Sequence, residues 1–315
     1  MIRISVVICT YNRGKLLADA LSSVCNQTLD PSVYEVIVID NNSTDNTNEV
    51  VKGYRRRFTN VSYCIEPHQG LSRARNRGWR EAKGEYVAYI DDDCKVPEQW
   101  LTVAKKIIEQ ISPDVFGGPY FTFYNTPKPH WFKDSYGSRE HGKEARFLTD
   151  NEYLSGGNIF FRRELLEILG GFDVSLGMSG QRLAYGEETA LLRHIRETMP
   201  EQIIYYDPEM YVHHLVHSKK MSLPWVIRQR FVDGRYSYRV FKNNSNTPGA
   251  RQSLQIRQSV ENLCKVVLNF TRNARRRDRV RYPYFQNYLY EEVFGHIKSI
   301  GILYEQYSEL IRYNK

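Results

Sequence analysis

An apolar run that ends in three consecutive aspartates constrains the fold of this chain more than any other stretch. Residues 86–90 (YVAYI) are followed directly by Asp91, Asp92 and Asp93. Such a run predicts a buried strand with the acids at its tip. Three adjacent carboxylates so close to a core stay ionised only where a cation neutralises them. Because Asp oxygens suit Mg²⁺ and Mn²⁺, we expect a metal site here; the alternative is a cap for a helix that begins near Pro97.

The length and charge of the chain limit its class. With 315 residues it can form one large α/β domain and a smaller appendage. The formal net charge of +8 favours an anionic partner, such as nucleotide phosphates, nucleic acid or an acidic membrane face. Charge alone does not choose among these partners.

The cysteines and the apolar segments indicate the compartment. Five cysteines occur without C-x-x-C spacing, so we expect reduced thiols in the cytoplasm and no zinc site. The first apolar run leads straight into a turn without a small-residue cleavage site, which predicts a first strand and not a signal peptide. No stretch approaches the roughly 18 consecutive apolar residues of a spanning helix. We therefore expect a cytoplasmic protein that does not cross a membrane.

Strand and helix patterns alternate in the first part of the chain, which predicts a doubly wound sheet. The predicted strands are residues 4–10, 35–40, 61–65 and 86–90. Ligands of such sheets bind beyond the carboxyl ends of the strands, so Thr10, Asp40 and Asp91 are expected to line one crevice. Neither G-x-G-x-x-G after the first strand nor G-x-x-x-x-G-K-S/T is present, which disfavours dinucleotide dehydrogenases and P-loop NTPases.

Short segments of this chain resemble, in order, the motifs of family 2 glycosyltransferases with the GT-A fold. The nucleotide-binding motifs correspond to residues 7–13 (VICTYNR), 38–45 (VIDNNSTD), 70–78 (GLSRARNRG) and 90–93 (IDDD). The similarity continues through residues 156–163, 170–173, 186–189 and 212–214. One such motif would be weak, whereas the ordered set is specific and covers about residues 4–240.

The resemblance implies a fold and a domain plan. We expect an α/β, GT-A, doubly wound (Rossmann-like) mixed sheet over residues 1–240. Residues 1–95 would form the nucleotide-binding half and residues 96–240 the acceptor half. A mainly helical, basic C-terminal extension is expected over residues 241–315.

The resemblance also implies an inverting transferase that uses a nucleotide sugar. Its predicted nucleotide site comprises Thr10, Tyr11, Arg13, Asp40, Arg75, Asp91 and Asp92. Asp40 would accept an N–H of a uracil-like or guanine-like ring, and Asp91 would hold the ribose hydroxyls. Asp93 would bind the Mn²⁺ or Mg²⁺ that bridges the diphosphate. As alternatives, Asp40 caps the next helix and Arg75 is a solvated surface arginine.

An inverting transfer needs a base within hydrogen-bond reach of the acceptor hydroxyl, and Glu188 is the predicted base. In most relatives this position is an Asp after Gly-Glu, whereas Glu188 is one methylene longer. Glu187 is therefore the substitute. The alternative for both residues is that acids at a helix start are favoured by the helix dipole.

The resemblance places His214 on a histidine that often joins the metal or the diphosphate, although this part of the chain also suits a polar loop. For the acceptor, a glycine turn at Gly157 and Asn158 would let backbone approach a ligand closely. Trp131 is a candidate to stack on a sugar face, and packing on the core is equally compatible with it.

The C-terminal part carries most of the concentrated positive charge. Six arginines lie within residues 272–281, beside several aromatic side chains. This pattern suits an anionic membrane surface, and a solvated helix face explains it equally well. The segment at Gln229 lacks the Q-x-x-R-W of processive polysaccharide synthases, which favours addition of a single sugar.

Together these features predict a cytoplasmic, metal-dependent inverting glycosyltransferase, with peripheral attachment to the inner membrane face as one option. It would move one sugar from a UDP- or GDP-type donor to a hydroxyl of a glycan or lipid-linked acceptor, in polysaccharide or glycolipid synthesis. A sugar-nucleotide pyrophosphorylase is an alternative, although residues 10–14 lack its glycine-rich loop. A non-enzymatic, basic nucleic-acid-binding protein is another, but no specific nucleic acid is expected.

Overall fold

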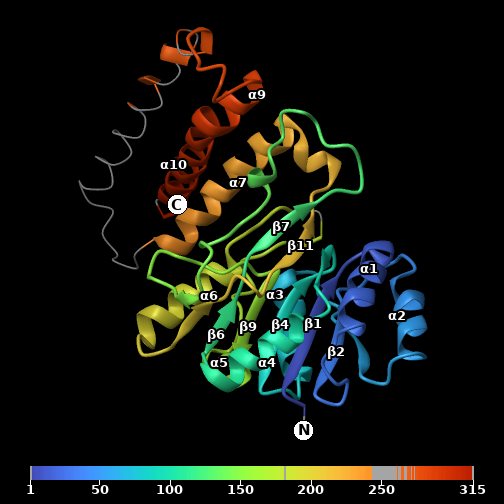
Figure 1. The fold of residues 1–315 in the computed structure, drawn as a ribbon. Helices are drawn as coiled ribbons and strands as arrows, with labels where there is room; N and C mark the ends of the chain where they lie inside the picture. Colours follow the sequence, from blue (N-terminus) through green and yellow to red (C-terminus); the bar gives the residue numbers. More distant parts are fainter. Residues whose placement is uncertain are drawn as a thin grey trace. The chain divides into compact units, whose positions relative to one another are not determined.

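The computed structural model describes residues 2–180, 182–242, 261, 264–265, 268–270, 272 and 274–313 (Figure 1). The chain forms two compact units. Unit 1 comprises Met1–Asn125, Asp134–Arg182 and Glu187–Val216, and unit 2 comprises Thr126–Lys133, Leu183–Gly186 and His217–Lys315. Residues 243–260 of the predicted C-terminal extension lie outside the described residues. The domain boundary at residue 241 stays a prediction.

Unit 1 contains an eight-stranded mixed sheet with the strand order β3-β2-β1-β4-β9-β6-β10-β8. The strands are β1 (Ile4–Thr10), β2 (Tyr34–Asp40), β3 (Val61–Ile65), β4 (Tyr86–Asp91), β6 (Val115–Gly117), β8 (Arg146–Phe147), β9 (Asn158–Arg162) and β10 (Ile204–Tyr206). The first four are parallel, whereas β9 runs antiparallel to β4 and β6. This arrangement confirms the expected doubly wound mixed sheet, and Figure 1 shows β2, β1 and β4 side by side.

A second, three-stranded sheet has the order β5-β11-β7. Its strands are β5 (Cys94–Lys95), β7 (Tyr120–Phe123) and β11 (Val212–Leu215). The polar-loop alternative for the neighbours of His214 is wrong for His213, because both histidines lie on β11, where His214 pairs with Cys94 of β5. This small sheet therefore joins the aspartate tip to a segment more than a hundred residues further along the chain.

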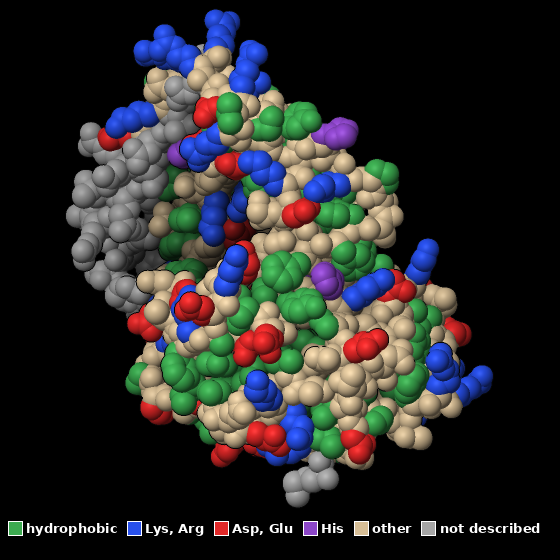
Figure 2. All heavy atoms as spheres, viewed as in Figure 1, with side chains coloured by type: hydrophobic (Ala, Val, Ile, Leu, Met, Phe, Trp, Pro, Cys, Tyr) green, Lys and Arg blue, Asp and Glu red, His purple; other side chains and the backbone are tan. Residues whose placement is uncertain are grey.

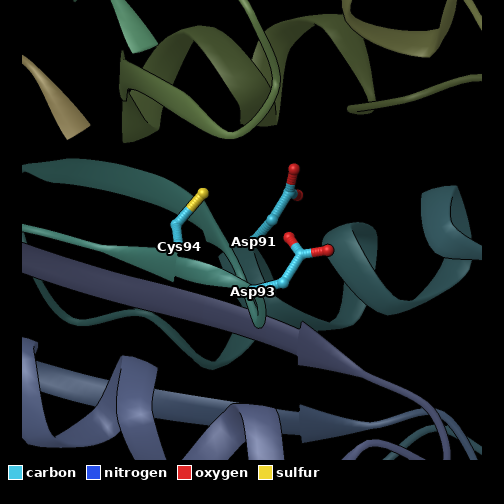
Figure 3. A group of neighbouring side chains, drawn as sticks. All are labelled: Asp91, Asp93 and Cys94. Carbon is cyan, nitrogen blue, oxygen red and sulfur yellow. The ribbon is translucent and has the colours of Figure 1, made fainter. Parts of the chain in front are cut away.

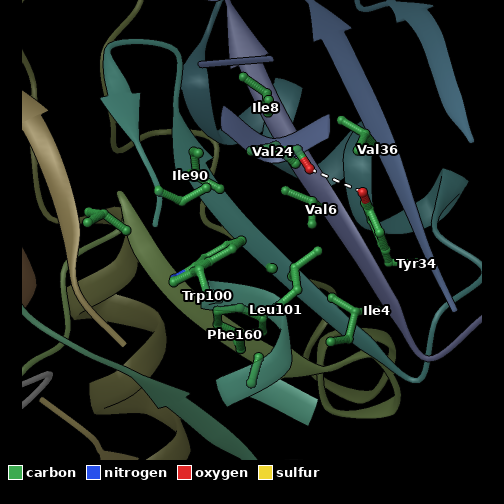
Figure 4. Packing of buried hydrophobic residues seen from close by; sticks show 14 of the residues in the cluster. Ile4, Val6, Ile8, Val24, Tyr34, Val36, Ile90, Trp100, Leu101 and Phe160 are labelled. Carbon is green, nitrogen blue, oxygen red and sulfur yellow. Dashed lines mark hydrogen bonds between the residues drawn. The ribbon is translucent and has the colours of Figure 1, made fainter. Parts of the chain in front are cut away.

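The helices of unit 1 cover both faces of the large sheet. On each face an apolar cluster lies between the helices and the strands. The helices are α1 (Gly14–Cys25), α2 (Thr47–Arg55), α3 (Leu71–Glu81), α4 (Trp100–Gln110), α5 (Arg163–Leu169) and α6 (Glu187–Thr198), with a 3₁₀ turn η1 at Asp134–Tyr136. Successive residues of a strand face opposite sides. Accordingly Ile8 packs in one cluster, with Trp100 and Phe160 (Figure 4), and Val7 packs in the other. A side chain at Gly78 would overlap Val7, so this glycine lets α3 approach β1.

Unit 2 is mainly helical, as expected for the C-terminal region. Its helices are η2 (Ser218–Met221), α7 (Leu223–Phe241), α9 (Phe285–Tyr288), the π-helical turn η3 (Leu289–Val293) and α10 (Phe294–Tyr313). Gly234 of α7 and Gly301 of α10 sit where any Cβ would overlap backbone of the other helix, so the two helices pack closely. None of the described helices combines the length and mean hydropathy needed to span a membrane.

Candidate active site

The carboxyl ends of the central strands meet at one edge of the large sheet. Thr10 at the end of β1 is level with Asp40 at the end of β2, and Cys9 is level with Asp91 at the end of β4. Asp40 is buried and accepts hydrogen bonds from the Ser43 N–H (2.8 Å) and the Tyr63 hydroxyl (2.6 Å). The edge thus places polar side chains where a doubly wound sheet binds its ligand.

Asp92, the middle aspartate, forms hydrogen bonds that join the carboxyl ends of β1 and β4. Asp92 is buried; Thr10 Oγ1 donates a hydrogen bond to its Oδ2 (2.7 Å), and Arg13 Nη1 donates one to its Oδ1 (2.8 Å). The same Arg13 nitrogen lies 3.2 Å from Asp93 Oδ2. Burial raises the pKa of Asp92 to about 6, an effect that Arg13 opposes and Asp93 reinforces. Asp92 therefore fixes the loop after β1 to the end of β4.

The outer two aspartates and the following cysteine form a cluster with donors for a metal ion, and a histidine lies beside one of the aspartates. One oxygen each of Asp91 and Asp93 and the Cys94 sulfur lie within 4.8 Å of one another, and both carboxylates point toward the same space in Figure 3. Nε2 of His214 lies 3.4 Å from Asp93 Oδ1. Burial raises the pKa of the Cys94 thiol well above its usual value, with Asp91 and Asp93 adding to the effect. The two carboxylates, with the thiol kept protonated, fit Mn²⁺ or Mg²⁺, and His214 offers an imidazole next to Asp93.

A buried ion pair lies beside this cluster. Arg75 of α3 is 3% exposed; its Nη1 donates a hydrogen bond to Glu187 Oε1 (2.6 Å) and its Nη2 donates one to the Gly156 carbonyl (3.1 Å). Nη2 also lies 3.6 Å from Asp91 Oδ1. Burial acts to lower the pKa of Arg75, but Glu187 and Asp91 outweigh it and the pKa is raised. The surface alternative for Arg75 is wrong.

The two glutamates at the start of α6 differ in environment. Glu187 is buried against Arg75, whereas Glu188 is half-buried. Burial raises the pKa of Glu187, with Glu188 adding to this effect and Arg75 opposing it. Burial also raises the pKa of Tyr120, and Arg139 opposes this shift, while Asp91 and Glu188 add to it. The charges of Glu188 and Asp91 therefore both disfavour ionisation of the Tyr120 hydroxyl.

Two glycines create the room that these side chains occupy. A Cβ at Gly157 would lie 2.6 Å from Asp91 Oδ2, and a Cβ at Gly156 would lie 2.6 Å from Arg75 Nη2. Neighbouring Asn158 is fully buried, donates to the carbonyls of Pro119 and Met210, and accepts from Trp100 Nε1 (3.2 Å). The turn at Gly156 and Gly157 thus packs directly against the side chains of Arg75 and Asp91.

The remaining predicted residues are placed as follows. Tyr11 is half-buried after the end of β1. Trp131 belongs to unit 2, where its carbonyl accepts a hydrogen bond from Asn287 Nδ2 (2.5 Å) and its ring lies 6.4 Å from that of Tyr290. All the other predicted residues belong to unit 1.

Residues 5–170, more than half of the chain, match the model of the family described as glycosyl transferase family 2. The chain belongs to this family. It is therefore a glycosyltransferase that uses a nucleotide sugar, and the pyrophosphorylase and nucleic-acid-binding alternatives are set aside.

Known relatives extend the similarity over most of the chain. A glucosyl-dolichyl phosphate glucuronosyltransferase of Haloferax volcanii is 29% identical over 251 residues, covering 76% of this chain and 77% of that protein. The succinoglycan biosynthesis protein ExoM of Rhizobium meliloti is 27% identical over 259 residues, covering 81% and 80%. The structure of the mannosyltransferase PcManGT from Pyrobaculum calidifontis, in complex with GDP-Man and Mn²⁺, superposes with a TM-score of 0.66 at 19% identity, covering 96% and 88%. The fold of this glycosyltransferase is thus GT-A.

Tyr120 is a residue of the site that sequence reasoning missed. Its ring lies 5.2 Å from that of His214, and the Arg139 guanidinium lies 6.0 Å from the Tyr120 ring centroid. Backbone hydrogen bonds of 3.0 Å in both directions join Tyr120 to Arg139. The available signal was the Gly-Gly-Pro turn just before Tyr120, which places an aromatic residue at the start of a strand.

Proposed function

We propose that this glycosyltransferase moves one sugar, with inversion and with bound Mn²⁺ or Mg²⁺, from a UDP- or GDP-type donor to a hydroxyl of a glycan or lipid-linked acceptor. The observation that carries this proposal is the convergence of Asp91 and Asp93, with His214 next to Asp93 and the Arg75–Glu187 pair next to Asp91. Carboxylates, an imidazole and a buried guanidinium at the carboxyl edge of the sheet suit a phosphorylated ligand.

Asp93 and His214 are the proposed metal ligands, and Asp91 faces the ribose. A divalent ion held there supplies charge neutralisation for the diphosphate leaving group. Asp91 is 38% exposed at its side chain, which leaves its oxygens accessible to donor hydroxyls. Thr10, Tyr11 and Asp40 border the base, because they lie at the ends of the neighbouring strands.

Glu188 is the proposed base. Glu187 is occupied by Arg75, so it positions the start of α6 and leaves the half-buried Glu188 to accept the proton of the acceptor hydroxyl. That hydroxyl attacks the anomeric carbon from the face opposite the diphosphate, which inverts the configuration. Arg13 and Asp92 hold the loop that flanks the donor, through the hydrogen bonds described above.

The backbone at Gly157 is proposed to approach the acceptor, with Asn158 fixing that turn. Trp131, which belongs to unit 2, stays a predicted sugar contact. The class of acceptor is inferred from relatives. The Haloferax volcanii protein is named for glucosyl-dolichyl phosphate and the Rhizobium meliloti protein for succinoglycan biosynthesis. We infer a glycan or lipid-linked acceptor, met at the cytoplasmic face of a membrane.

The test is titration of the full chain with UDP, GDP and a panel of their sugars, with Mn²⁺ or with EDTA, followed by measurement of nucleoside diphosphate release. We expect metal-dependent binding of one nucleotide class, which Asp93→Asn removes and which Asp19→Asn, a surface control on α1, preserves. Equal affinity in Mn²⁺ and EDTA would contradict the metal site. Absence of binding to every nucleotide sugar would contradict the donor assignment.

A further inference from the structure

A turn in unit 2 carries an exposed aliphatic side chain between arginines. Val280 lies between Arg279 and Arg281, and 92% of its surface is exposed. Asp278 Oδ1 accepts hydrogen bonds from the backbone N–H groups of Val280 (2.7 Å) and Arg281 (3.2 Å). The Asp278 carbonyl accepts one from the Tyr282 N–H (2.9 Å). The backbone of the turn is thus fixed with Val280 in solvent.

The turn is also anchored to the rest of unit 2. Tyr282 is buried, its hydroxyl donates a hydrogen bond to Glu292, and its ring lies 5.7 Å from that of Tyr288. Arg281 forms an ion pair with the same Glu292 (3.2 Å). Because the segment after Val280 is held in this way, the exposure of Val280 is a feature of a folded turn.

The arginines around the turn fall into two groups. Arg277 is partly buried, with its guanidinium 5.6 Å from the ring centroid of Phe285 and its Nη1 donating to the Ala274 carbonyl (3.3 Å). The exposed ones are Arg272, Arg275, Arg276, Arg279 and Arg281. Asp278 is the one acid in residues 272–281, and its carboxylate serves the turn. Figure 2 shows Lys and Arg side chains gathered around the part of unit 2 that carries α9.

We propose that this turn docks the enzyme on an anionic lipid surface, with Val280 entering the headgroup layer and Arg275, Arg276 and Arg279 on lipid phosphates. Charge complementarity supports the partner, since several exposed guanidinium groups surround one apolar tip. Exposed Tyr284 and Phe285 follow it and suit the interface between headgroups and acyl chains. Binding to nucleic acid through phosphates would need only the arginines, so the exposed aliphatic tip favours the lipid surface.

The test measures partition of the full chain onto vesicles of phosphatidylcholine alone and of an equimolar mixture with phosphatidylglycerol, at low and high salt. We expect salt-reversible binding to the acidic vesicles only. Each arginine contributes a factor of about five, so joint replacement of Arg275, Arg276 and Arg279 by Gln should lower partition by about a hundredfold. Val280→Ser should weaken partition without changing its salt dependence, because the charge is unchanged.

A matched control removes the same charge elsewhere. Arg55, Arg56 and Arg57 are three exposed arginines of unit 1, and their joint replacement by Gln should leave partition unchanged. The proposal is overturned if both triple variants lose the same partition onto vesicles, or if the wild type binds neutral and acidic vesicles equally. It is also overturned if RNA is retained in a way that depends on Arg275, Arg276 and Arg279 but not on Val280. Nucleotide binding is measured in parallel and should stay at the wild-type level, so failure here is distinct from failure of the proposed function.

Discussion

Arg75 and Glu187 form an ion pair of 2.6 Å between α3 and α6, and 4% and 7% of their side chains are exposed. Arg75 also approaches Asp91, whereas Glu187 precedes the proposed base. One guanidinium therefore links the donor side of the site to the start of the helix that carries Glu188. Because the pair is buried, its integrity affects both folding and catalysis.

Removal of Arg75 should destabilise the protein strongly. Arg75→Met leaves Glu187 buried without its cation, which costs about 3–5 kcal/mol of unfolding free energy. The control Arg77→Met, on the same helix, breaks the exposed pair of Arg77 with Glu81 and should change stability by less than about 1 kcal/mol. Urea unfolding measures both values. Similar losses of unfolding free energy in the two variants would show that the buried pair contributes no more to stability than the exposed pair.

Gly157→Ala should weaken donor binding. The added Cβ would lie 2.6 Å from Asp91 Oδ2 and must displace that carboxylate. Gly53→Ala in α2 is the control, because no atom beyond its chain neighbours and the local helix backbone lies within 4 Å of its Cβ position, and it should gain roughly 0.5–1 kcal/mol of stability. Calorimetric titration with nucleotide in Mn²⁺ compares them. Wild-type affinity in Gly157→Ala would argue against a role of Asp91 in donor binding.

The central strands could be predicted from sequence because each is a continuous apolar run. In β1 and β4 that run ends in a polar residue, so the positions of Thr10 and Asp91 at the strand ends could be predicted together with the strands. By contrast β11 is a four-residue strand with two histidines in its centre. A strand this short, paired with the two-residue β5, has no hydrophobic pattern that sequence reasoning can detect.

Contacts between segments far apart in the chain could not be predicted from the sequence, for a different reason. Arg75 and Glu187 are 112 residues apart, and each is compatible with a solvated helix position when taken alone. Trp131 has the same difficulty: its hydrogen bond with Asn287 spans 156 residues. Only the packing of the helices decides such pairs, whereas local residue patterns decide the helices themselves.

Acid should weaken unit 2 through Glu305. Arg235 Nε and Arg239 Nε donate hydrogen bonds to it (2.7 and 2.8 Å). Burial acts to raise the pKa of Glu305, but these bonds outweigh burial and lower it below the usual 4.5. A lowered folded-state pKa contributes stability above the unfolded pKa, and this contribution is lost as the pH falls through the folded value.

Glu305→Gln should therefore be less stable than wild type near neutral pH, and the difference should shrink as the pH falls below 4.5. Thermal unfolding over this pH range measures the difference. A gap that stays constant or widens in acid would contradict the proposed ionic role of Glu305.

Glu188 is proposed to take the proton while Glu187 holds Arg75. The most direct measurement is the rate of nucleoside diphosphate release from the bound donor sugar in the presence of acceptor, for Glu188→Gln beside wild type. We predict a fall of roughly two to four orders of magnitude in turnover with donor affinity and unfolding free energy unchanged. Wild-type turnover in Glu188→Gln, with turnover lost in a folded Glu187→Gln that binds donor normally, would contradict the claim.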